Sequence, residues 1–122
     1  MEQVLVIRDE LCDLNTYINA ERSNRFYGAT IKKKCTQYVI NAIESNDKLE
    51  PITEKQDFSF CWYQKNKRKD PDNIAFACKF VFDGLVKSGI LPNDNQAFVG
   101  RIHHTILIDK EDPRVEVIFF AS

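Results

Sequence analysis

The chain has 122 residues, of which 43% are hydrophobic, so it can build one core and has no room for two. Its 17 Lys and Arg side chains almost balance 18 Asp and Glu side chains, which leaves a formal net charge of -1. Bulk charge therefore neither attracts nor repels nucleic acid, and affinity for a polyanion must depend on where the positive side chains lie. We expect a single domain over residues 1–122.

The sequence lacks the signals of membrane insertion, secretion and nucleotide binding. Its apolar runs are too short to span a bilayer, and the first ten residues lack a signal peptide's basic start and cleavage site. The glycines Gly28, Gly84, Gly89 and Gly100 form no phosphate-cradling loop. We therefore expect a cytoplasmic protein with no membrane partner and no nucleotide cofactor.

The four cysteines are widely spaced along the chain. Cys12, Cys35, Cys61 and Cys78 include no C-x-x-C pair that would mark a zinc site or a thiol redox site. The even count permits two disulfides, but nothing else in the sequence indicates an oxidising compartment. We expect the cysteines to be reduced and mostly buried.

The N-terminal half predicts one strand and one helix. Residues 3–8 are rich in Val and Ile and alternate weakly, which favours a strand. Residues 9–28 contain many Asp, Asn and Ser side chains that favour turns or a short helical piece, and we expect a loop there. From Thr30 to Ser45 the apolar residues recur at spacings of three and four, which predicts an amphipathic helix.

The C-terminal half predicts three strands around a second helix. Residues 57–63 alternate aromatic and small side chains, and residues 97–108 and 114–120 supply two more strands. The helix runs from Asp70 to Gly89. The order strand, helix, strand, helix, strand, strand implies an α/β (α+β) domain in which two main helices pack on one mixed sheet.

The start of the second helix concentrates acidic side chains. Asp70 can accept backbone N–H bonds as N-cap, Pro71 suits the first helical position, and Asp72 meets the positive end of the helix dipole. Capping alone explains these residues without a metal. On a continuous helix, however, Asp72, Lys79 and Asp83 fall within about 40° of one another. Capping does not predict this stripe, although Lys79 and Asp83 can also form a plain surface ion pair.

The acidic cluster, together with Asp94 at the turn beyond the helix, predicts a site for a hard divalent cation. Such a cluster is costly unless a cation neutralises it. Mg²⁺ is typically held by a few carboxylates, waters and substrate phosphate. In phosphodiester hydrolysis the metal activates water and offsets charge on phosphorus, and Lys79 could stabilise that charge or position the water.

Basic side chains close to the acids are candidates for contact with the DNA backbone. One run directly precedes Asp70, which favours phosphate binding over the alternative that each run is merely a solvated face. The residues predicted to bind phosphates are Lys65, Lys67, Arg68 and Lys69, with Arg22, Arg25, Lys32, Lys33 and Lys34 as weaker candidates.

Three motifs in this part of the chain resemble the RusA family of Holliday junction resolvases, found largely in phages and prophages. They are RKDPDN at 68–73, KFVFDGL at 79–85 and SGILPND at 88–94. The segment LNTY at 14–17 resembles the family's N-terminal segment more loosely. The resemblance implies a RusA-like fold for the domain.

The resemblance also implies a site and an activity. The matching residues are Asp70, Asp72 and Asp94 as metal-binding aspartates, Lys79 as the catalytic lysine, and Asp83 as a further acid of the motif. We expect Asp83 and Asn73 to support the site from its edge. The family resemblance further implies a homodimer that binds four-way DNA junctions and makes paired, symmetric nicks with Mg²⁺ or Mn²⁺. The chain departs from the best-known members in a longer interval between Asp72 and Lys79, and in having Asn93 where a second aspartate can occur.

Two other functions fit the same residues. A DNA-binding module of the same fold would use the aspartates as caps and would not hydrolyse DNA. A regulatory protein that senses divalent ions would bind metal without affinity for DNA. Nicking of a junction in Mg²⁺ but not in chelator separates the nuclease from the first alternative, and a salt-titrated gel shift separates it from the second.

Overall fold

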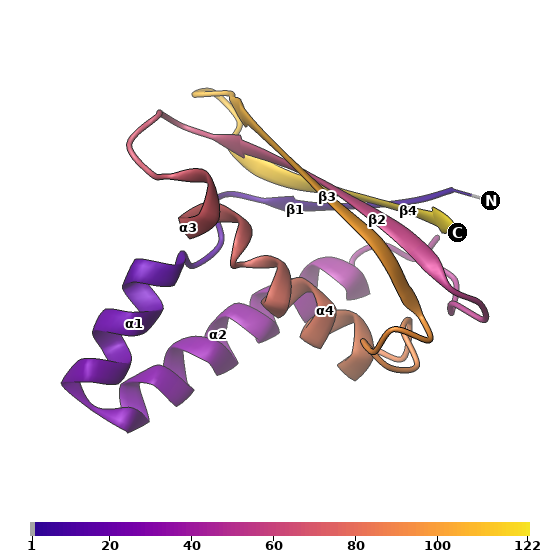
Figure 1. The fold of residues 1–122 in the computed structure, drawn as a ribbon, viewed down its shortest axis with the longest axis horizontal. Helices are drawn as coiled ribbons and strands as arrows, with labels where there is room; N and C mark the ends of the chain where they lie inside the picture. Colours follow the sequence, from indigo (N-terminus) through magenta and orange to yellow (C-terminus); the bar gives the residue numbers. More distant parts are fainter. Residues whose placement is uncertain (1) are drawn as a thin grey trace.

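A computed structural model describes residues 2–122, apart from the side chain of Arg25. Figure 1 shows a sheet with all helices on one of its faces. In chain order the elements are β1 (Gln3–Arg8), α1 (Leu14–Ser23), α2 (Arg25–Glu44), β2 (Gln56–Gln64), α3 (Pro71–Ala75), α4 (Cys78–Lys87), β3 (Val99–Ile108) and β4 (Arg114–Ala121). The predicted α+β class with a mixed sheet is confirmed. Within residues 2–122, no helix has both the length and the apolar character needed to cross a bilayer.

The sheet has the order β1-β4-β2-β3, which leaves β1 and β3 at its edges. β4 pairs antiparallel with both β1 and β2, whereas β3 pairs parallel with β2. A parallel pair needs a crossover connection, which α3 and α4 supply between these two strands. Side chains of β2 alternate between buried and half-buried, and its buried aromatic side chains, Phe58, Phe60 and Trp62, belong to the core.

The expected loop over residues 9–28 is wrong, because α1 and the first turns of α2 lie there. Each helix begins at a polar cap. The Asp13 carboxylate accepts the Thr16 N–H at 2.8 Å, and the Asn24 side-chain oxygen accepts the Phe26 N–H at 2.8 Å. α1 carries apolar residues at helical spacing, Leu14, Tyr17 and Ile18, but the Asp, Asn and Ser side chains along and around it favour turns.

The expected continuous helix from Asp70 to Gly89 is also wrong, because it is divided into α3 and α4. Short-range bonds mark the break. The Lys79 N–H donates to the Phe76 carbonyl at 3.1 Å, and the Phe80 N–H donates to the Ala77 carbonyl at 3.0 Å. These i to i+3 bonds advance the chain by about 120° per residue instead of 100°. Lys79 therefore does not lie on a regular helical stripe below Asp72.

α4 lies close against α2 because Gly84 has no side chain. A Cβ placed on Gly84 would lie 2.5 Å from Cγ1 of Val39 on α2, well inside van der Waals contact. Val39 is fully buried at this point. The glycine therefore sets the spacing between α2 and α4.

The prediction that all cysteines are reduced is wrong for one pair. Cys12, in the loop before α1, forms a disulfide with Cys35 on α2, and their Cα atoms lie 6.4 Å apart. Spacing along the chain does not reveal such a pair, since it depends on how the loop folds back on the helix. Cys61 and Cys78 are free and half-buried, and burial raises the pKa of both thiols.

Candidate metal centre and nucleic-acid interface

Two of the predicted metal ligands lie at the start of α3. Asp70 is its N-cap residue and Asp72 is in its first turn, and both are exposed. Pro71 supplies the fixed backbone angle that suits the first position of a helix. The Asp70 side chain makes no capping hydrogen bond, so the simple capping interpretation does not describe its carboxylate.

The third predicted ligand, Asp94, lies in the exposed loop that connects α4 to β3. The Gln56 N–H donates to the Phe98 carbonyl at 3.0 Å, which places this loop beside the start of β2. Asp70 instead follows the end of β2. The nine residues of β2 span about 26 Å from first to last, so Asp94 lies at the opposite end of the sheet from α3 (Figure 1).

One chain alone therefore does not gather the three aspartates. Among residues 2–122, no group of three or more His, Cys, Asp or Glu side chains is arranged to hold a metal ion. Mg²⁺ binds oxygen at about 2.0–2.1 Å, far less than the length of a nine-residue strand. Of the three predicted ligands, Asp70 and Asp72 lie together at the start of α3, and Asp94 lies apart from them in the loop before β3.

The two predicted site residues on α4 differ in exposure. Lys79 is exposed in the first turn of the helix. Asp83 is half-buried, and its Oδ2 atom is shielded from solvent without a hydrogen-bond partner. An unpartnered carboxylate oxygen is unfavourable away from water. Asp83 is the one acidic residue of α4, and a nearby cation or hydrogen-bond donor would stabilise its shielded oxygen.

Asn73 links α3 to α1. Its side chain is buried, and its Oδ1 atom accepts the Asn15 N–H at 2.9 Å. Asn15 lies in the first turn of α1, where backbone amides have no partner within the helix. Asn73 on α3 thus caps the start of α1. This hydrogen bond joins the motif at 68–73 to the segment LNTY at 14–17, which are far apart in the sequence.

Three aromatic side chains pack where α1 meets the break between α3 and α4. The ring of Tyr17 on α1 lies 5.7 Å from that of Phe76 and 6.3 Å from that of Phe80. Phe76 and Phe80 meet edge to face at 5.7 Å across the break between α3 and α4. These contacts fix α1 against the point where the chain turns from the aspartates towards Lys79.

Residues 9–13, here named the acidic loop, hold the basic segment before α3. The Glu10 carboxylate accepts the Lys65 N–H at 2.9 Å and lies 3.3 Å from the Lys69 ammonium. The Asp13 carboxylate pairs with the same ammonium at 3.0 Å. Sequence reasoning missed both acids, because their partners lie more than 50 residues away along the chain.

The ion pairs of Lys69 shift the pKa values of the groups involved. Burial alone would raise the pKa of Asp13, but hydrogen bonds from Thr16 and Lys69 outweigh it and hold the value below its usual range. Burial alone would lower the pKa of Lys69, but Asp13 and Glu10 raise it above the usual value. Lys69 therefore stays charged, and its charge is compensated within the protein instead of being directed at phosphate.

The other predicted DNA contacts remain on the surface. Lys34 lines a cavity of about 240 Å³ together with Glu10, so the acidic loop lies close to both basic runs. Lys65, Lys67, Arg68, Arg22, Lys33 and Lys34 are exposed, and Lys32 is half-buried. The side chain of Arg25 lies outside the described residues.

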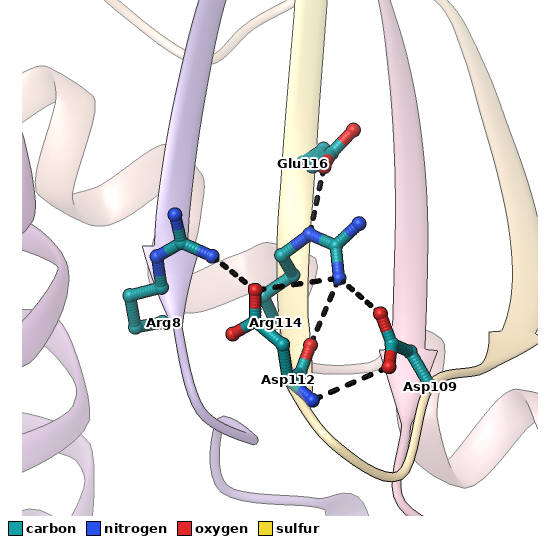
Figure 2. Close-up of polar contacts among 5 residues, drawn as sticks. All are labelled: Arg8, Asp109, Asp112, Arg114 and Glu116. Carbon is teal, nitrogen blue, oxygen red and sulfur yellow. Dashed lines mark hydrogen bonds and ion pairs between the residues drawn. The ribbon is translucent and has the colours of Figure 1, made fainter.

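A second group of charged side chains lies at the end of the sheet where β2 ends, and its members form ion pairs with one another (Figure 2). The Arg114 guanidinium donates to Asp109 at 2.8 Å and to Glu116 at 2.7 Å, and it lies 3.8 Å above the ring of Tyr63. Hydrogen bonds from Arg114 to Glu116 and Asp109 raise the pKa of the guanidinium above its ordinary value. Arg8 pairs with Asp112 in the same group. These ion pairs fasten the β3–β4 link. The Arg114 side chain is largely shielded from solvent, whereas the Arg8 side chain remains exposed.

Comparison of the sequence with models of protein families and with curated proteins finds no match. The resemblance to RusA resolvases therefore remains a prediction from the motifs between Arg68 and Asp94. The geometry adds that these motifs lie on one crossover connection, with the acids divided between its two ends.

Proposed function

We propose that the chain is a Mg²⁺-dependent endonuclease of the RusA type that resolves four-way DNA junctions as a homodimer. The observation that carries the proposal is the pair of exposed carboxylates, Asp70 and Asp72, directly beside the exposed basic residues Lys65, Lys67 and Arg68. Carboxylates that face solvent next to positive charge suit a metal-assisted reaction on a phosphate backbone.

The residues present fit Mg²⁺, since they offer carboxylate oxygens and no soft ligand. Asp70 and Asp72 would hold the ion, which supplies Lewis-acid activation of water and phosphate. Lys79 is exposed on the next helix and would offset negative charge on the phosphate. The basic residues before α3 would hold the flanking backbone, and Mn²⁺ would substitute for Mg²⁺.

A second copy of the chain would reunite the divided ligand set. β3 is a ten-residue edge strand, and Ile102, Leu107 and Ile108 on it are exposed. Unpaired edges of this length are templates for pairing with another chain. Antiparallel pairing of β3 with its own copy reverses the ends of the partner's sheet. The loop with Asp94 in the second copy would then approach the α3 end of the first, and two-fold symmetry would create two such sites.

Cleavage of a labelled four-way junction tests the nuclease proposal. We expect paired nicks in Mg²⁺ and none in excess chelator. Asp72→Asn should abolish nicking and leave junction binding largely intact, because it removes a metal-ligand charge without removing positive side chains. Asp47→Asn, an exposed acid in the turn after α2, serves as the matched control and should cut normally. Undiminished cleavage by Asp72→Asn would show that the enzymatic assignment is wrong.

The same assay separates a DNA-binding module without hydrolysis. That alternative draws support from the lack of a three-acid group among residues 2–122 of one chain. It predicts that the protein binds junctions equally well in Mg²⁺ and in chelator and never nicks them. A divalent-ion sensor would bind Mn²⁺ and fail to shift a junction in a gel at any salt concentration.

A further inference from the structure

The acidic loop is attached to α2 by the Cys12–Cys35 disulfide, and it carries the contacts that fix the segment before and within α3. Glu10 accepts the Lys65 N–H, and Asp13 and Glu10 pair with Lys69. Immediately after the loop, the Asn15 N–H donates to the side chain of Asn73. The loop and the first turn of α1 together therefore contact the chain on both sides of Asp70 and Asp72.

Apart from these contacts, the loop is held by a hydrogen bond from the Asp9 N–H to the Pro113 carbonyl at 2.8 Å and by Leu11, which packs against the core. Leu11 and Cys12 are only half-buried, and the following helix α1 has no fully buried residue. Asp9 adopts a left-handed backbone angle (φ 69°), a conformation that Asp tolerates better than most residues. A segment with so few buried apolar contacts belongs to the less stable end of a fold. The covalent bond to the buried residue Cys35 is its strongest attachment.

We propose that the Cys12–Cys35 disulfide is a thiol-sensitive tether, and that the acidic loop it fastens positions the segment 65–73. Reduction releases the loop, and with it the contacts at Lys65, Lys69 and Asn73, while the sheet stays folded. Any effect of reduction on DNA cleavage rests on the proposed nuclease function, whereas the effect of the disulfide on the position of residues 65–73 does not. Disulfides in reducing compartments are usually transient or redox-sensing, which suits a bond whose loss alters one local segment.

The chemistry requires an external thiol reductant, here a dithiol. A thiolate of the dithiol attacks one sulfur of the disulfide, which breaks the bond between Cys12 and Cys35 and forms a mixed disulfide. The second thiol of the reagent then closes a cyclic disulfide, so the reagent is oxidised and the protein gains two electrons and two protons as two thiols. An open cavity of about 240 Å³, lined by both cysteines together with Lys34 and Tyr38, gives a reductant access.

Amide hydrogen exchange on the full chain tests the coupling without any DNA. The Lys65 and Asn15 amides report directly, since each donates to a contact made or organised by the loop. We expect reduction by a dithiol, or the double change Cys12→Ser and Cys35→Ser, to speed their exchange about tenfold or more. Amides of β2 and β4 should change less than about twofold.

Two single variants sharpen the test. Glu10→Gln in the oxidised protein should speed exchange at Lys65, because it weakens the contact without touching the disulfide. Cys61→Ser, at a free thiol on β2, should leave both the exchange pattern and the dithiol response unchanged. Any of three results would overturn the proposal. The first is four titratable thiols in the protein before reduction. The others are unchanged exchange at Lys65 and Asn15 after reduction, and equally faster exchange throughout the sheet. A reduced protein with the expected exchange pattern but no nuclease activity in either state would refute only the proposed function.

Discussion

Replacement of Asn73 by alanine tests whether α3 is fixed through α1. In the native protein the buried Asn73 oxygen accepts the Asn15 N–H at 2.9 Å, and this amide has no partner within its own helix. Asn73→Ala removes the acceptor and leaves the Asn15 N–H without its side-chain partner. The unsatisfied part-buried donor costs about 1–3 kcal/mol, and loss of a helix cap typically costs about 1 kcal/mol. We therefore expect the free energy of unfolding to fall by about 1–2 kcal/mol.

Urea unfolding followed by circular dichroism measures this loss, and exchange at the Asn15 amide locates it. Asn93→Ala is the matched control, because Asn93 accepts the Asn95 N–H at 3.1 Å through the same atom but is exposed. Water replaces that bond, so the control should lose less than about 0.5 kcal/mol. Equal losses in the two variants, or an unchanged Asn15 amide in Asn73→Ala, would refute the assignment of Asn73 as a cap across elements.

Three further predictions follow from helix packing, charge and DNA contact. Gly84→Ala should lower the free energy of unfolding by about 1–3 kcal/mol, because its new methyl group would overlap Val39. Thermal melting measures this loss, and an unchanged midpoint would contradict the packing of α4 on α2. The lowered pKa of Asp13 contributes stability that is complete above the ordinary carboxyl pKa near 4 and is lost as pH falls through the lowered value. Acid titration of unfolding should therefore be less steep in Asp13→Asn, and identical profiles argue against its ion pair. The double change Lys67→Ala and Arg68→Ala should reduce the salt slope of junction binding in a gel shift by about two, and a wild-type slope removes this run from the interface.

The sequence predicted the sheet well because its strands carry strong signals. β2 alternates large buried side chains such as Phe58 and Phe60 with half-buried ones, and this period of two is visible without a structure. α1 was missed because the many Asp, Asn and Ser side chains of residues 9–28 favour turns, and they outweighed the short apolar period of Leu14, Tyr17 and Ile18. The break after Ala75 was missed because apolar spacing through Phe80 continues as if the helix were unbroken.

The candidate site was predictable in its residue types and not in its arrangement. The concentration of acids at Asp70 and Asp72 is a local feature, so the sequence displays it directly. The position of Asp94 depends on the parallel pairing of β3 with β2, which is a property of the whole sheet. The contacts of Glu10 with Lys65 depend likewise on residues distant in the chain, and no pattern of spacing reveals them.

Under the proposed arrangement, Asp70 and Asp72 of one chain share a cation with Asp94 of a second copy. Trans-complementation between two inactive variants tests this sharing. Asp72→Asn and Asp94→Asn are each expected to be inactive. In a mixed dimer the Asp94→Asn chain retains intact Asp70 and Asp72, and the Asp72→Asn chain supplies an intact Asp94. One site of two is then whole.

Co-expression of the two variants in equal amounts makes about half of the dimers mixed, so about a quarter of all sites should be restored. Mg²⁺-dependent nicking of a four-way junction should reappear in the mixture, mostly as single nicks instead of paired cuts. A mixture as inactive as either variant alone, beside an active wild-type protein, would contradict a site shared between two chains.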